Sequence, residues 1–157
     1  QIGCSCRNRH CPRCQGMASA KWVAKQQEGL LPCRYFHLVF TLPHELNRLA
    51  QYQSKVVYQC LFKAAWETLV KFSERKQQGQ LGMTGVLHTW GQNLSQHIHL
   101  HCLIPAGTLK TSQWHAIDKG YLYPVRALST VFRGKMLAAL KAQVSLGGIE
   151  VPQKWCV

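Results

Sequence analysis

The spacing of hydrophobic residues along the chain predicts alternating helices and strands. Helix-forming residues occupy 15–27 and stop before Gly29. Residues 33–42 are apolar, aromatic and β-branched and are followed by Pro43, which is typical of a strand. Between residues 45 and 77, apolar residues recur at helical spacing. This segment therefore predicts one long amphipathic helix or two helices in series.

The second half of the chain predicts a hairpin followed by shorter elements. Residues 83–90 and 97–104 have strand composition, and the turn residues Gly91, Gln92 and Asn93 lie between them. An antiparallel sheet covered by helices, an α+β fold, suits this order of elements. The remaining segments predict a short helix, a short strand and a final helix, at 112–119, 121–123 and 125–144.

Histidines alternate with apolar residues in the strand predicted over 97–104. The two-residue period places His97, His99 and His101 on one face, opposite Ile98, Leu100 and Cys102. Neighbours on one face lie about 6 to 7 Å apart, a span that two imidazoles can bridge by binding one cation. Imidazoles alone suit zinc, copper or nickel, whereas phosphate oxygens and water would select Mg²⁺ or Mn²⁺. A chance cluster on an exposed polar face is the alternative.

Other side chains are open candidates for the same site. His88 belongs to the partner strand of the predicted hairpin, and His44 and Glu45 follow the first strand. Each of these histidines could instead be a hydrogen-bonded structural residue. Asp118 is the only aspartate and the five glutamates are scattered, which argues against a two-metal nuclease built from carboxylates alone.

A cysteine cluster opens the chain. Cys11 and Cys14 have the spacing of a zinc knuckle, with Cys4, Cys6 and His10 upstream. Structural zinc is favoured over a redox pair because no βαβ pattern surrounds the cluster. The arginines between these ligands could contact DNA phosphates or form a solvated rim; they are Arg7, Arg9 and Arg13.

Composition indicates an anionic partner. The 157 residues include 19 Lys and Arg against 6 Asp and Glu, which gives a net charge of +13, and 46% apolar content argues against disorder. No apolar run reaches membrane-spanning length and no signal peptide is visible, so no membrane is expected. The isolated cysteines inside apolar segments read as buried thiols in a reducing cytosol. The chain lacks the phosphate-binding loop of nucleotide-dependent enzymes.

Several motifs together resemble the HUH transposases of the insertion-sequence ninety-one type, which move rolling-circle elements. The matching stretches are, in chain order, Ser5–Gln15, Phe40–Leu46, Leu87–Gln92, His97–Cys102 and Tyr123–Lys135. The resemblance implies a partial zinc-binding module and connecting helix over 1–30. It also implies an RRM-like, ferredoxin-like HUH endonuclease core over 31–157, incomplete at its C-terminus.

The resemblance also assigns metal sites. His99 and His101 match the His-hydrophobic-His pair that binds Mg²⁺ or Mn²⁺, because family members commonly have proline at the position of Ile98, and His97 is an additional candidate. Zinc would be bound at the N-terminal cluster by Cys6, His10, Cys11 and Cys14.

The activity implied is nicking and rejoining of single-stranded DNA through a phosphotyrosine, in the bacterial cytoplasm and without a nucleotide cofactor. The DNA would be a transposon end, which can form a hairpin. The nucleophilic tyrosine is expected downstream of Val157, since the chain reads as truncated at both ends. Two alternatives stay open: a non-catalytic zinc-finger DNA-binding protein, and a replication initiator or relaxase with the same chemistry. The proposed DNA contacts beyond the cysteine cluster are Arg126, Arg133, Lys135, Trp90 and Trp114.

Overall fold

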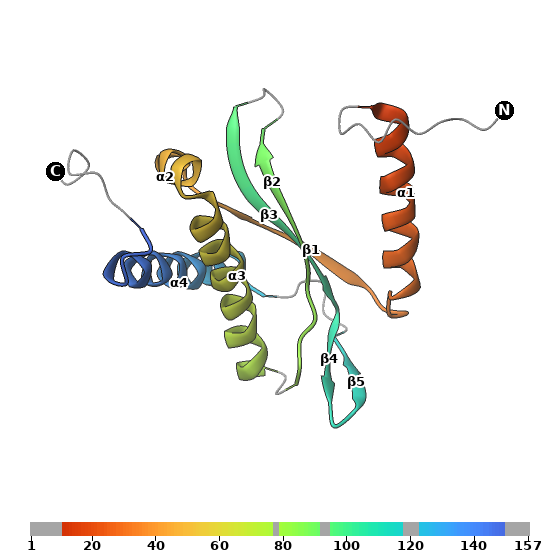
Figure 1. Cartoon of the computed structure of the whole chain (residues 1–157). Coiled ribbons are helices and arrows are strands. Elements are labelled where there is room, and N and C mark those ends of the chain that lie inside the picture. The colour runs from red at the N-terminus through yellow and green to blue at the C-terminus, as the bar shows by residue number, and fades with distance from the viewer. Residues whose placement is uncertain (1–10, 77–78, 92–94, 118–122, 150–157) are drawn as a thin grey trace. The chain divides into compact units, whose positions relative to one another are not determined.

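The computed structural model describes residues 11–76, 79–91, 95–117 and 123–149 (Figure 1). The chain divides into two compact units, Gln1–Pro32 and Cys33–Val157. The described part of the first unit is α1 (Pro12–Glu28), which has a proline at its start and Cys11 as its N-cap residue. Proline suits this position because its fixed φ is helical and the missing N–H has no helical partner there. The helix predicted over 15–27 is confirmed.

The second unit contains a three-stranded antiparallel sheet with β3 (Gln96–Pro105) between β1 (Tyr35–Thr41) and β2 (Thr84–Trp90). β2 and β3 form the predicted hairpin, in which Leu87 lies opposite Leu100. β1 runs antiparallel to the other side of β3. All three strands lie where the apolar patterns predict them.

Helices cover one face of this sheet. The segment predicted as one or two helices forms a 3-10 turn, η1 (His44–Leu46), and two α-helices, α2 (Asn47–Tyr52) and α3 (Ser54–Lys76). The last described helix is α4 (Val125–Ser145), which packs against α3. Of the helices in the described ranges, none is both long and apolar enough to cross a membrane. The core joins both layers through residues such as Phe40, Leu61, Leu69, Ile98, Leu100 and Phe132.

The helix predicted over 112–119 is wrong. A second antiparallel pair, β4 (Gly107–Lys110) and β5 (Gln113–Ala116), occupies this segment instead. Thr111 and Ser112 both have positive φ, 48° and 62°, which is the conformation of a tight two-residue hairpin turn. Threonine and serine rarely adopt it, so the sequence gives no turn signal there.

Tertiary packing explains why the second hairpin forms. A Cβ atom at Gly107 would lie only 2.4 Å from the Trp114 ring, so only glycine permits this close approach of the two strands. The strand predicted over 121–123 lies mostly outside the described residues, and Tyr123 is a buried core residue outside any strand. The predicted α+β fold, with helices covering an antiparallel sheet, is confirmed.

Candidate metal centre

The alternation of side chains along β3 gives the sheet one packed face and one open face. Ile98, Leu100 and Cys102 have no exposed surface, because they pack in the core beneath α3 and α4. The histidines between them point the other way: His99 and His101 are half-buried. The aliphatic side chains therefore anchor the strand while the imidazoles are presented on its open side.

His88 joins these two histidines from the neighbouring strand. It lies directly opposite His99 in the β2–β3 pairing. The register of the two strands shifts between His88 and Trp90, and irregularities of this kind re-aim side chains near functional sites. Ligand nitrogens of His88, His99 and His101 all lie within 4.8 Å of one another. The two further candidates at the end of β1, His44 and Glu45, do not belong to this group. Both are exposed, and Nδ1 of His44 lies 3.5 Å from Oε2 of Glu45.

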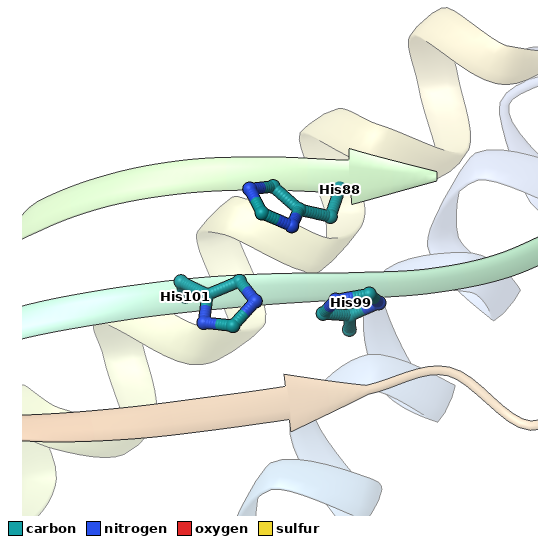
Figure 2. A group of neighbouring side chains, drawn as sticks. All are labelled: His88, His99 and His101. Carbon is teal, nitrogen blue, oxygen red and sulfur yellow. The ribbon is translucent and has the colours of Figure 1, made fainter. Parts of the chain in front are cut away.

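The three rings converge on one point. Figure 2 shows one nitrogen of each ring directed into the space between His88, His99 and His101. Ring centroids are 4.4 Å apart for His88 and His101, 4.9 Å for His99 and His101, and 5.2 Å for His88 and His99. His97 stands outside this group, with its ring 4.9 Å from that of His99. We call His88, His99 and His101 the histidine triad.

Hydrogen bonds occupy the outer nitrogens of two triad members. Nδ1 of His99 lies 2.8 Å from the carbonyl oxygen of His97, to which only a protonated nitrogen can donate. Nδ1 of His101 lies 2.7 Å from Nε2 of His37 on β1. In both rings Nε2 is the remaining nitrogen, which neither of these hydrogen bonds uses. Neutral imidazoles held in this way have a lone pair available for a metal ion.

The surroundings of His101 favour its neutral form. Burial lowers the pKa of this imidazole, and the neighbouring rings of His88, His99 and His37 lower it further. A ligand must be deprotonated to bind a cation. His101 is therefore ready to bind a divalent ion near neutral pH.

This environment predicts a pH dependence. Mn²⁺ binding should weaken as the pH is lowered from about 7.5 to about 5, because each ligand that takes up a proton reduces the apparent affinity about tenfold per pH unit below its pKa. Since the pKa of His101 is below its ordinary value, this ring remains a ligand after an ordinary histidine has become charged. Free Mn²⁺, counted by electron paramagnetic resonance during a titration, measures the effect. An affinity that stays constant over this range would contradict binding by imidazoles.

The donor set fits a divalent cation with open positions. Three neutral imidazoles supply part of a coordination shell, and oxygen atoms of a substrate or water would complete it. Among the described residues, the groups able to hold a metal include no carboxylate-containing cluster. The predicted residues His99 and His101 thus come together with His88, whereas His97 does not join them.

The remaining predicted metal ligands belong to the first unit. Cys6 and His10 lie outside the described residues, and so does the side chain of Cys14. Cys11 is half-buried and carries a free thiol. The zinc assignment at this cluster stays a prediction.

The predicted DNA contacts lie in several places. Arg126 and Arg133 are exposed on α4, the helix layer on the side of the sheet opposite the triad. The ammonium of Lys135, on the same helix, lies 2.9 Å from the carboxylate of Glu67 and is partly neutralised by it. The structure does not describe Arg7, Arg9 or the side chain of Arg13.

The two tryptophans named as stacking candidates differ in their surroundings. Trp90 is 64% exposed and lies opposite Gln96, beyond the register shift that follows His88. Trp114 is half-buried and packs within the β4–β5 hairpin against Gly107. Sequence reasoning missed His37. The two-residue period of β1 is visible in the sequence, but which residue of β3 it would face is not.

Two family models match the chain. The model described as "Transposase zinc-binding domain" matches residues 1–42, and the model described as "Putative transposase" matches residues 82–154. The second match covers β2, β3 and α4 and therefore includes the whole histidine triad.

Curated relatives point the same way. The chain is 43% identical over 150 residues to "Putative transposase y4qJ" of Sinorhizobium fredii, a match that covers 93% of this chain. It is 35% identical over 105 residues to the "Transposase for insertion sequence element IS801" of Pseudomonas savastanoi pv. phaseolicola, covering 67% of this chain. The chain spans 38% of the length of the first relative and 25% of the second.

Solved structures share the fold over about two thirds of this chain. A metal-bound structure of the conjugative relaxase TrwC in complex with oriT DNA matches with a TM-score of 0.53 and 20% identity, over 68% of this chain and 42% of that one. A metal-free TrwC complex matches with a TM-score of 0.52 and 21% identity, over 68% of this chain and 43% of that one. At this identity the likeness shows the fold alone, and it agrees with the predicted α+β arrangement of an antiparallel sheet covered by helices.

Proposed function

This chain belongs to the transposases of the insertion-sequence ninety-one type, and from that premise we propose that it carries the metal site of an enzyme that nicks and rejoins single-stranded DNA. One observation supports the proposal most strongly: three imidazoles from two paired strands converge on the open face of the sheet. The transposase is preferred to a replication initiator or a relaxase because both curated relatives are transposases.

His88, His99 and His101 would hold the metal ion. When bound, a divalent cation polarises the scissile phosphate and offsets the charge that develops during attack on it. The protein's own contribution is to keep the three ligand nitrogens fixed: β3 is the central strand, and its opposite face is locked in the core. Mg²⁺ or Mn²⁺ suits the proposed reaction, since phosphate oxygens and water would complete the shell. One TrwC structure in complex with oriT DNA is metal-bound, which supports a metal ion in a fold of this kind.

The attacking group is proposed to be a tyrosine that follows Val157 in the longer protein. Bond energy kept in a phosphotyrosine would allow rejoining without a nucleotide cofactor. Among the described tyrosines, Tyr123 is buried in the core, and burial raises its pKa, which disfavours the reactive phenolate. Because the chain spans 38% of the length of its first relative, the covalent step is assigned to a residue of the longer protein.

The N-terminal segment is proposed to be a zinc-binding module that helps to bind DNA. The match to a transposase zinc-binding domain supports this assignment. Its ligands would be Cys6, His10, Cys11 and Cys14, and the arginines between them would contact phosphates. The exposed Arg126 and Arg133 on α4 would add contacts to a strand that passes around the sheet. We place the complete protein in the bacterial cytoplasm.

A binding experiment tests this proposal on the chain as it stands. The chain should bind a fluorescently labelled single-stranded oligonucleotide. Its affinity should fall at least about tenfold when NaCl is raised from about 50 to about 200 mM, as contact with three or more phosphates requires. Fluorescence anisotropy measures the affinity. A denaturing gel run with Mn²⁺ present should show no covalent protein–DNA adduct. Covalent attachment would contradict the proposed position of the nucleophile, and an absence of binding at low salt would contradict the DNA partner.

A further inference from the structure

We propose that His37 is a positioning residue that aims His101 at the metal ion. The inference rests on the metal centre proposed above and concerns a side chain outside the triad. Nε2 of His37 lies 2.7 Å from Nδ1 of His101, which places a hydrogen bond between β1 and β3 on the open face of the sheet. The two rings are nearly parallel, with centroids 5.0 Å apart and planes inclined by 11°.

The strand register brings the two rings together. Val39 lies directly opposite His101, so His37 is the diagonal neighbour two residues away on the same face of β1. Long side chains on diagonal positions of an antiparallel pair are within reach of each other. His37 is exposed, and its ring reaches across to the half-buried His101.

The direction of the hydrogen bond follows from the chemistry of the ligand. A neutral imidazole has one protonated nitrogen and one lone pair. If His101 accepted a proton from His37 at Nδ1, its own proton would be on Nε2, and the nitrogen facing the triad could not bind a metal. In the metal-binding form His101 must therefore donate from Nδ1, and Nε2 of His37 must accept.

His99 has the same requirement and meets it differently. Its Nδ1 donates to the carbonyl oxygen of His97, a backbone group that no substitution removes. At His101 the equivalent acceptor is a side chain, so this half of the arrangement can be tested by mutation. Partners in this position fix the orientation and raise the basicity of a ligand, and their loss typically weakens metal binding about 10- to 100-fold.

His37 does not act as a fourth ligand in this arrangement. Its Nε2 lies 2.7 Å from Nδ1 of His101, and Nε2 of that ring takes no part in this contact. Within the described part of the chain, the group whose ligand atoms lie within 4.8 Å of one another contains His88, His99 and His101 and leaves His37 out.

The test compares Mn²⁺ binding by the whole chain and four variants, followed by electron paramagnetic resonance. Mn²⁺ is used because it prefers nitrogen and oxygen ligands to the thiolates of the N-terminal cluster. His37→Leu removes the acceptor, and His37→Gln restores a hydrogen-bonding group at a similar reach. His115→Leu is the matched control, since His115 is also an exposed strand histidine but belongs to β5. His99→Ala removes a proposed ligand.

Affinity for Mn²⁺ should fall about 10- to 100-fold in His37→Leu and return to within about threefold of the unsubstituted chain in His37→Gln. His115→Leu should leave it unchanged. Binding by His37→Leu within threefold of the unsubstituted chain, or equally weak binding by both His37 variants, would overturn the positioning role alone. Unchanged binding by His99→Ala would overturn the metal centre itself, and the inference with it. Circular dichroism checks that each variant is folded.

Discussion

Replacing His99 or His101 by alanine is expected to lower DNA nicking at least about 1000-fold, equivalent to about 4 kcal/mol of transition-state stabilisation. The protein used must continue far enough to contain the proposed tyrosine. Each substitution removes one of three converging imidazoles, so the remaining two cannot keep the cation in place against the scissile phosphate. Cleavage of a labelled single-stranded oligonucleotide, followed over time on a denaturing gel, measures the rate.

The matched control for this prediction is His97→Ala. His97 lies on the same strand and face, but its side chain is exposed and outside the triad. Its backbone carbonyl, which holds His99, is unaffected by the substitution. Nicking by His97→Ala should stay within about tenfold of the parent protein. Equal losses of nicking rate in His97→Ala, His99→Ala and His101→Ala would contradict a specific role for the triad. An undiminished nicking rate in His99→Ala would contradict the role of His99 as a metal ligand.

The second large effect concerns stability. Leu100→Ala should lower the free energy of unfolding by about 2 to 5 kcal/mol, because this side chain is fully buried on the central strand and its loss leaves a cavity. Urea denaturation monitored by circular dichroism measures the change. Leu103→Ala is the control on the same strand: Leu103 is 38% exposed on the open face and should contribute less than about 1 kcal/mol. Equal effects of the two substitutions would contradict the assignment of the packed face.

Much of this fold could be predicted because strong periodic patterns agree with the final packing. The two-residue alternation around Leu100 fixed both the strand and the face that carries the histidines. The β2–β3 hairpin was predictable because the two strands are separated by a short turn. His88 could be named as a candidate on this basis, although its exact register opposite His99 could not.

The parts that could not be predicted depend on contacts between distant segments. His37 and His101 are 64 residues apart, and no local pattern shows which residues of β1 and β3 become neighbours. The β4–β5 hairpin was missed because Thr111 and Ser112 form its turn without the usual glycine or asparagine. Ser112 instead resembled the first residue of a helix. In both cases tertiary packing decides a conformation that local sequence leaves open.

The strict alternation along β3 has a consequence for how this protein can change. Side chains switch faces at every residue, so inserting or deleting a single residue would move every later side chain of the strand to the opposite face. The imidazoles beyond that point would then point into the core, and the leucine and isoleucine side chains would point outward. Exchanges of one aliphatic for another at Ile98 or Ile104 are mild by comparison. The length of this segment is thus under tighter constraint than its composition. A library of variants should tolerate substitutions in this strand far better than an insertion or deletion between His99 and His101.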